Sequence, residues 1–312
     1  MSKIKLALLS GGTSGEREVS LKTGEQIFKA LDKNKYEIFR YDPKTDLKQF
    51  ILDTLDKKID LVFPALHGPF GEDGKIQGLF DTLNIPYLFS DCLSSAVAMN
   101  KNQTKILVKN RGVLVANDTS IKQGEKYDVN KIISKLSLPI VIKPSELGSS
   151  VGMSIAKTKE NLAKGIKEAF EHGEEILLEQ FIKGRELTVG VMGNKNVKAL
   201  PVIEIIPKVA DWFDYKAKYE VGGSEEVCPA DIPEDIKNKI QKISLEIYRI
   251  IGCKDLARVD FIWQEGSDDL YFLEINTIPG MTATSLFPQA AQAAGLEFSD
   301  FLDKLISYNI KD

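Results

Sequence analysis

Residues 258–285 constrain this chain most, because they place charged side chains on two short strands. Apolar residues around Arg258 and Asp260, and then around Glu274 and Asn276, predict two strands, and the polar run between them predicts a hairpin. Strand side chains alternate between two faces, so each of these pairs lies on one face of its strand. The hairpin therefore gathers two carboxylates, an amide and a guanidinium at one place.

Two interpretations of this polar face stay open. Charges are common on the solvated face of an antiparallel hairpin. A ligand site is favoured by the apolar neighbours Phe261, Trp263 and Phe272, because clustered carboxylates between buried flanks repel one another unless a cation lies among them. Hard oxygen ligands of this kind suit magnesium bridging phosphates rather than zinc.

Composition and length narrow the class of protein. A chain of 312 residues, 43% hydrophobic and 28% charged, is typical of a soluble globular protein with two or three domains. The net charge of -4 argues against nucleic-acid binding, and without an apolar run of about 20 residues we expect no membrane span. Three cysteines without metal-ligand spacing suit a reducing cytoplasm, and two histidines are too few for a histidine-built metal site.

The first hundred residues alternate between strand and helix patterns. This order predicts an α/β fold with a doubly wound parallel sheet, in which ligands bind beyond the carboxyl ends of the strands. Two glycine-rich loops, 10–18 and 67–74, fall at that edge. The predicted strands are 4–9, 36–41, 61–65 and 87–88, and the predicted helices are 19–31, 47–55 and 74–83.

Two further units are expected from the rest of the chain, which gives domains at 1–95, 96–182 and 183–312. The middle unit has predicted helices at 102–110 and 161–170 and strands at 140–143 and 176–180. The last unit has predicted strands at 186–192 and 197–206, a loop at 211–225, a helix at 233–251, the hairpin and a final helix.

Lys143 ends an apolar strand directly before a loop rich in glycine and serine. Backbone amides of such a loop can surround phosphate oxygens, and the lysine adds a positive charge. A flexible linker has a similar composition, so this alternative stays open. The glycine patterns of P-loop kinases and of nicotinamide dehydrogenases are both absent, which disfavours these two classes.

Three weaker signals each have a structural alternative. The strand exit from Glu179 through Ile182 to Glu186 is suited to holding a purine and a ribose hydroxyl, or is an ordinary strand–turn–strand with exposed glutamates. The aromatic, lysine-rich loop 211–219 is either a lid or a packing patch. His67, at the carboxyl end of a strand, either orients a substrate or has a structural role.

The order of these motifs along nearly the whole chain resembles that of the D-alanine–D-alanine ligases of the ATP-grasp superfamily. The matching blocks are 11–20, 67–74, 148–153, 214–219, 258–260 and 274–282. The resemblance implies a doubly wound N-terminal domain followed by a two-lobed α+β ATP-grasp module. It further implies a cytoplasmic homodimer that uses ATP and two Mg²⁺ or Mn²⁺ ions to join two D-alanines through an acyl phosphate for peptidoglycan synthesis.

The resemblance also implies roles for individual residues. Those expected to hold the metal ions are Asp260, Glu274 and Asn276, and those expected to contact ATP are Lys101, Lys143, Ser150, Glu179, Ile182, Glu186 and Lys218. Arg258 is expected to stabilise an oxyanion, and Glu16 and His67 to bind the first D-alanine. Gly280 and Ser285 are expected to bind the carboxylate of the second. Glu16, Ser149 and Tyr219 are expected to hold a lid closed against water.

Departures from the family pattern concern loop dynamics and affinity rather than the reaction. They are Glu146-Leu147 in the phosphate loop, Trp212-Phe213 in the lid and Thr284 before Ser285. Two alternatives are a ligase for D-lactate or D-serine, and a non-catalytic ATP-binding protein. The second is expected to lack Arg258 or a metal ligand, and this chain has them all.

Overall fold

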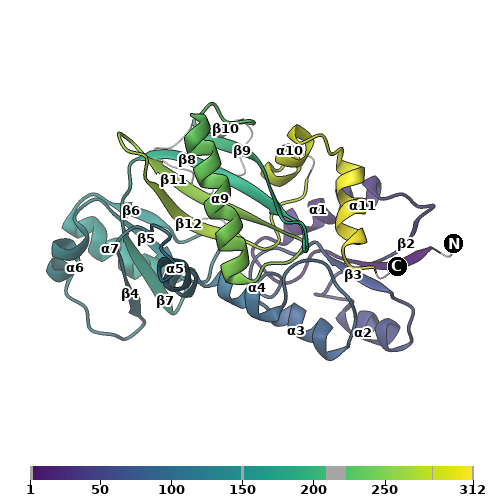
Figure 1. The fold of residues 1–312 in the computed structure, drawn as a ribbon. Helices are drawn as coiled ribbons and strands as arrows, with labels where there is room; N and C mark the ends of the chain where they lie inside the picture. Colours follow the sequence, from purple (N-terminus) through teal and green to yellow (C-terminus); the bar gives the residue numbers. More distant parts are fainter. Residues whose placement is uncertain (1–2, 149–150, 209–222, 283, 311–312) are drawn as a thin grey trace.

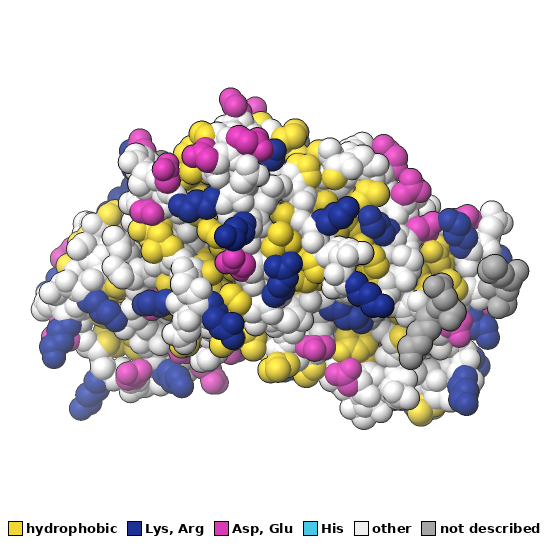
Figure 2. Space-filling view, in the orientation of Figure 1, with side chains coloured by type: hydrophobic (Ala, Val, Ile, Leu, Met, Phe, Trp, Pro, Cys, Tyr) yellow, Lys and Arg dark blue, Asp and Glu magenta, His cyan; other side chains and the backbone are white. Residues whose placement is uncertain are grey.

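The computed structural model describes residues 3–148, 151–208, 223–282 and 284–310. Three sheets follow one another along the chain and are covered by helices (Figure 1). Within the described residues, no helix combines the length and apolar character needed to cross a membrane. Lys and Arg side chains are intermixed with Asp and Glu over the face shown in Figure 2.

The first sheet is parallel, with strand order β2-β1-β3, as the alternating pattern predicts. Its elements are β1 (Ile4–Leu9), α1 (Arg17–Ala30), β2 (Tyr36–Tyr41), α2 (Leu47–Leu55), β3 (Leu61–Pro64) and α3 (Lys75–Thr82). The central strand β1 is an apolar run because helices cover both faces of the sheet. The predicted strand 87–88 is wrong, since Tyr87 makes only an isolated bridge to Val62.

The two faces of the first sheet belong to different cores. On one face, Ala7 and Leu9 pack with Phe50 of α2 and Phe80 of α3. On the other face, Leu6 and Leu8 share a core with α1 and with helix α11 (Phe298–Ser307) from the far end of the chain. Figure 1 shows α11 beside the strands of the first sheet. The last helix of the chain therefore packs against one face of the first sheet and completes its core.

The second sheet is antiparallel, with strand order β4-β7-β5-β6. Helix α4 (Cys92–Met99) leads into it, and its elements are α5 (Lys101–Lys109), β4 (Asp118–Lys122), α6 (Val129–Leu136), β5 (Ile140–Pro144), β6 (Ser154–Ala156), α7 (Lys159–Ala169) and β7 (Glu175–Gln180). The sequence patterns missed α4, α6, β4 and β6. These elements are short, and the two strands lie at the sheet edges, where polar residues are tolerated.

The third sheet is antiparallel, with strand order β10-β9-β8-β11-β12. Its elements are β8 (Gly184–Met192), β9 (Lys198–Pro207), β10 (Ser224–Val227), α9 (Glu234–Ile251), β11 (Leu256–Gln264) and β12 (Leu270–Asn276), followed by α10 (Leu286–Ala293). Helix α9 packs an apolar stripe against this sheet (Figure 1). The predicted final helix is two helices, α10 and α11. Most of the predicted loop 211–225 lies outside the described residues.

Asp255, which is fully buried, joins parts of the chain that are distant in sequence. Its carboxylate accepts a hydrogen bond from the backbone N–H of Phe89 (2.7 Å) and from the side-chain amides of Asn194 (2.8 Å) and Asn309 (2.7 Å). Burial raises the pKa of Asp255, and these donors together with Lys254 oppose that effect. The end of the first unit, the β8–β9 turn and the chain's C-terminal end thus meet at one carboxylate.

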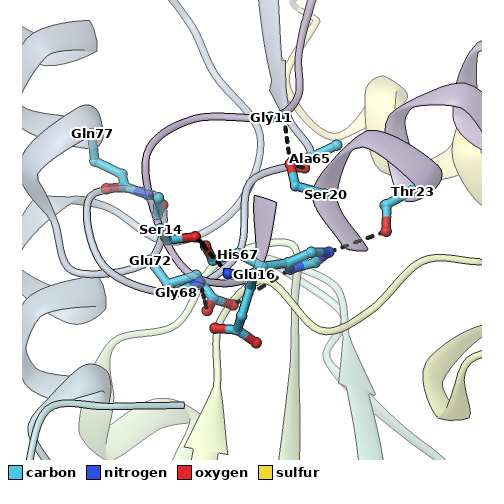
Figure 3. Close-up of polar contacts among 11 residues, drawn as sticks. Gly11, Ser14, Glu16, Ser20, Thr23, Ala65, His67, Gly68, Glu72 and Gln77 are labelled. Carbon is cyan, nitrogen blue, oxygen red and sulfur yellow. Dashed lines mark hydrogen bonds and ion pairs between the residues drawn. The ribbon is translucent and has the colours of Figure 1, made fainter. Parts of the chain in front are cut away.

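The Ser20 hydroxyl joins the two glycine-rich loops at the carboxyl edge of the first sheet. It accepts a hydrogen bond from the backbone N–H of Gly11 (2.7 Å) and donates one to the carbonyl of Ala65 (2.6 Å), as Figure 3 shows. Ser20 is fully buried, so neither backbone group has water as a substitute partner.

Ser20→Ala is therefore expected to lower the free energy of unfolding by about 1–3 kcal/mol, because it leaves two buried backbone groups unsatisfied. Chemical denaturation measures the change. Ser307→Ala is the matched control, since its hydroxyl bonds the carbonyl of Lys304 at an exposed position. Equal stability of the two variants would contradict the bridging role of Ser20.

Candidate active site

The hairpin of β11 and β12 forms with its polar residues on one face, as the alternating pattern predicts. Arg258 pairs with Asn276, and Asp260 pairs with Glu274, in an antiparallel register. Because directly opposite residues project from the same face, all four side chains lie together.

A β-bulge follows Asp260 in this register, so that Phe261 pairs with Phe272 and Leu273 is left over. Without the bulge, Phe272 would share the face of Glu274. Instead, Phe272 is buried in the core, edge-on to Phe261, and both Leu273 and Glu274 line the cleft between the second and third sheets. The bulge therefore places the apolar side chain of Leu273 next to the carboxylate of Glu274 in the lining of the cleft.

Asp260 is the centre of the polar face and is 5% exposed. Its two oxygens accept hydrogen bonds from Arg258 Nε (2.9 Å) and a terminal nitrogen (2.8 Å), and further bonds come from Asn276 Nδ2 (3.1 Å) and Thr188 Oγ1 (2.5 Å). Burial acts to lower the pKa of Arg258, but Asp260 more than offsets this and raises it. The guanidinium is therefore charged and held in a fixed orientation.

The inter-sheet cleft lies between β5, β6 and β7 on one side and β8, β11 and β12 on the other. It brings together six of the sequence-predicted ATP contacts and metal ligands, namely Lys101, Lys143, Glu179, Ile182, Glu186 and Glu274. Apolar side chains such as Val141, Ile155 and Tyr271 form much of its remaining wall. Apolar walls with a few convergent charges suit a flat ring that carries an anionic tail.

Two buried lysines hold the carboxylate of Glu179, which is 4% exposed. Lys143 Nζ lies 2.6 Å from one oxygen, and Lys105 contacts the other oxygen and also Asp118 (2.7 Å). Burial raises the pKa of Glu179, but Lys143 and Lys105 more than offset this and lower it to about 2. Because Lys105 also pairs with Asp118, two lysines face two carboxylates, and this buried network holds Lys143 in place at the wall of the cleft.

Lys101 connects the cleft to the polar face of the hairpin. Its ammonium donates a hydrogen bond to the carbonyl of Leu147 (2.6 Å) and lies 3.4 Å from Glu274. Leu147 belongs to the loop expected to surround phosphate. A cation therefore stands between that loop and a predicted metal ligand.

A second, polar cavity opens on the other side of Glu274. It is lined by the sequence-predicted residues Glu16, His67, Arg258, Glu274, Asn276, Gly280 and Ser285. The first two come from the loops of the first sheet, and the others come from the hairpin and the segment after it. Glu274 lines both the cleft and this polar cavity, so the two open onto one carboxylate.

His67 lies at the base of the polar cavity and is 6% exposed. Its Nε2 is 3.1 Å from the Thr23 hydroxyl, and its Nδ1 is 4.0 Å from Glu72 (Figure 3). Glu72 also accepts the backbone N–H of Gly68 (2.7 Å). Burial raises the pKa of Glu72, and His67 only partly opposes it.

Two glycines of the polar cavity lie close to side chains of the site. Gly68 has a φ of +74°, and a Cβ there would lie 2.5 Å from a carboxylate oxygen of Glu16. At Gly280, a Cβ would lie 3.0 Å from the Ser285 hydroxyl. Both glycines therefore let backbone groups approach a side chain that is expected to contact substrate.

The donor set on the hairpin fits magnesium. Asp260, Glu274 and Asn276 offer only oxygen ligands, and Mg²⁺ binds to proteins through one or two carboxylates and completes its shell with water and substrate phosphates.

Four predicted site residues, Ser149, Ser150, Lys218 and Tyr219, lie outside the described residues. Sequence reasoning in turn missed Thr188, Lys105 and Glu72. Thr188 shares a strand face with Glu186 and pairs with Asp260, so the period of two is a signal that points to it. Lys105 and Glu72 carry no such pattern, because only the tertiary fold buries them beside their partners.

The chain has a parallel sheet unit followed by two antiparallel sheets around a lysine-lined cleft, and this cleft opens onto the polar cavity. This architecture defines an ATP-grasp ligase. The comparisons give the particular family. Residues 107–307 match the family model described as D-ala D-ala ligase C-terminus, and residues 40–90 match D-ala D-ala ligase N-terminus. The chain belongs to the D-alanine–D-alanine ligase family.

Relatives match over nearly the full length. A D-alanine–D-alanine ligase of Syntrophobacter fumaroxidans is 47% identical and covers 99% of this chain and 99% of its own. Among solved structures, a D-alanine–D-alanine ligase from Bacillus anthracis has a TM-score of 0.87 at 35% identity and covers 98% of this chain and 97% of its own. The VanG D-Ala:D-Ser ligase from Enterococcus faecalis has a TM-score of 0.85 at 32% identity and covers 99% and 100%.

Glu179→Gln is expected to destabilise the protein by about 3–5 kcal/mol at neutral pH, because it leaves two buried lysines without their shared carboxylate. The pKa of Glu179 is lowered from 4.5 to about 2, so its stabilising effect is complete above pH 4.5 and is lost as the pH falls towards 2. Denaturation curves at pH 7, 5.5, 4 and 3 should show a constant gap between wild type and variant at the two higher values and a gap that narrows below pH 4.5.

Glu168→Gln is the control for this comparison, because Glu168 pairs with Lys164 on an exposed helix face. It should change stability by no more than about 1 kcal/mol. A gap between wild type and Glu179→Gln that stayed constant down to pH 3 would refute the ionised Glu179.

Proposed function

We propose that this chain uses ATP to join two molecules of D-alanine into D-alanyl-D-alanine, for peptidoglycan precursor synthesis. The observation that carries the proposal is the shared wall of the two cavities. Glu274 lines the cleft suited to a nucleotide and the polar cavity suited to an amino acid. A phosphate at the end of one would therefore meet a carboxylate in the other, which is the geometry that acyl phosphate formation requires.

In the first step, a carboxylate oxygen of one D-alanine attacks the γ-phosphorus of ATP, the bond to the β–γ bridging oxygen breaks, and ADP leaves. Lys101 and Lys143 stand where they reduce the repulsion between the two anions. Glu16 binds the ammonium group of this D-alanine, and His67 lies beside it. The product is D-alanyl phosphate.

In the second step, the amine of the other D-alanine attacks the acyl carbon, and phosphate leaves as the amide bond forms. Arg258 stabilises the oxyanion that develops on the former carbonyl oxygen, because Asp260 holds its guanidinium in place before the reaction. The Gly280 backbone and the Ser285 hydroxyl bind the carboxylate of the attacking D-alanine. We assign Ser149, Tyr219, Ser150 and Lys218 their roles in lid closure and ATP binding from the family resemblance alone.

Asp260, Glu274 and Asn276 would hold two Mg²⁺ or Mn²⁺ ions between the hairpin and the phosphates of ATP. Bound there, the ions would supply neutralisation of the charge on the transferring phosphoryl group. We also propose the cytoplasm as the location, a homodimer as the assembly, and domains at 1–95, 96–182 and 183–312.

A second candidate is a ligase with another acceptor. The likeness to the VanG D-Ala:D-Ser ligase favours D-serine as the rival, since that structure covers almost all of this chain. Phosphate release with ATP and D-alanine, followed by mass analysis of products formed with D-alanine, D-serine and D-lactate in competition, separates the candidates. D-alanyl-D-alanine should dominate, and ATP turnover that yields no dipeptide would refute the proposal.

Arg258→Lys is expected to lower kcat by about 10²–10³-fold, because a single ammonium cannot reproduce the oriented donor of the oxyanion. ATP affinity should change little. Arg185→Lys is the matched control, since Arg185 also makes a bidentate contact, with Glu204, outside the polar cavity. Equal losses in kcat for the two variants would refute the role of Arg258.

Glu274→Gln is expected to raise the Mg²⁺ concentration that gives half-maximal activity by about 10-fold or more, because one of two anionic ligands is lost. Titration of MgCl₂ at saturating ATP measures the shift. Glu265→Gln, in the exposed turn of the same hairpin, removes an equal charge and should leave the titration unchanged. A curve for Glu274→Gln that overlays the wild type would exclude Glu274 as a ligand.

A further inference from the structure

Glu226 has no role in the ligation described above, yet it lines the polar cavity. It lies on β10, beside Glu225. The two glutamates have different surroundings, because neighbouring strand residues project to opposite faces. Glu225 forms an exposed ion pair with Lys208 (3.1 Å) and does not line the cavity.

Gln289 of α10 fixes the position of the Glu226 carboxylate. Its side-chain nitrogen donates one hydrogen bond to Glu226 and another to the carbonyl oxygen of Thr284 (2.8 Å). Two hydrogen bonds that share one nitrogen place the carboxylate within about 6 Å of the Thr284 carbonyl. The backbone N–H of Gln289 also bonds the carbonyl of Ser285 (3.1 Å), so the helix that carries Gln289 is joined directly to this loop.

Thr284 adjoins the residue proposed to bind the acceptor's carboxylate. The Ser285 hydroxyl is held by the Thr282 hydroxyl (2.7 Å) and by the Thr282 backbone N–H (3.1 Å). Glu226 therefore presents its charge at the end of the polar cavity where the acceptor's carboxylate is proposed to bind.

Possible acceptors differ in charge at their reacting end. D-Alanine and D-serine arrive as zwitterions with an ammonium group, whereas D-lactate has a hydroxyl and arrives as an anion. The charged groups that line the polar cavity are Glu16, Glu72, Glu226 and Glu274 against Arg258 and Lys22, beside His67. Gln289, which holds this carboxylate, is uncharged, and among the described residues Glu226 forms no ion pair, so its negative charge favours a zwitterion over an anion.

We propose that Glu226 is a specificity-determining residue of the acceptor site, which selects amino acids over hydroxy acids by charge. The proposal rests on the ligase function proposed above. One charge several ångströms from the bound acceptor is expected to change the ratio of kcat/KM for D-lactate to that for D-alanine by about 5- to 30-fold.

The experiment is a competition assay with ATP, D-alanine and excess D-lactate, in which the dipeptide and the depsipeptide are quantified by mass. Glu226→Gln removes the charge and keeps an oxygen that accepts the bond from Gln289. The depsipeptide-to-dipeptide ratio should rise about 5- to 30-fold in this variant. In a parallel competition with D-serine, the product ratio should stay at the wild-type value, because both acceptors are zwitterions.

Glu225→Gln is the matched control, since it removes the same charge one residue away on the other face of β10. Its D-lactate ratio should equal that of wild type. The proposal is overturned if Glu226→Gln gives the wild-type ratio, if depsipeptide stays undetected in every variant, or if Glu225→Gln shifts the ratio equally. Failure of the wild-type enzyme to make any dipeptide would instead refute the ligase function itself.

Discussion

The contact between Arg258 and Asp260 is the interaction on which the site depends, and the register of one hairpin produces it. A shift of β12 by one residue against β11 would turn Glu274 and Asn276 into the core and bring apolar residues to the polar face. The position of β11 between β8 and β12 fixes that register from both sides. Thr188 on β8 adds a hydrogen bond to Asp260, so the carboxylate is oriented from three strands.

The charged side chains of the site are held in place by ion pairs, which differ between the cleft and the polar cavity. Lys105 and Lys143 are balanced by Glu179 and Asp118, and this network holds Lys143 beside Lys101 in the wall of the cleft, where phosphates are proposed to bind. In the polar cavity, Arg258 is matched by Asp260, and the carboxylates around them leave a negative surplus, which suits ammonium groups and metal ions. The cleft thus offers two lysines to phosphates and the polar cavity offers carboxylates to ammonium groups, on the two sides of Glu274.

The parts of the structure that the sequence predicted are those where a local pattern coincides with burial. The hairpin was predictable because its polar positions recur with a period of two between apolar neighbours, and the parallel sheet because strands such as Leu61–Pro64 are continuous apolar runs. Short edge strands such as β4 and β6 carry no such pattern. The partners of Glu179 and the bulge after Asp260 depend on contacts between distant elements, which no local pattern encodes. The choice of D-alanine came from family resemblance rather than from spacing.

The polar cavity and the cleft are attached to different hydrophobic cores of the fold. Ile278, Met281 and Phe287, which flank the acceptor loop, belong to the same core as Leu6 and Leu8 of the first sheet. The loops that carry Glu16 and His67, which we propose bind the first amino acid, project from that sheet, so both halves of the polar cavity are fixed to one core. The cleft instead lies between the separate cores of the second and third sheets. Motion of the second sheet would therefore open the cleft to nucleotide and leave the amino-acid sites in register.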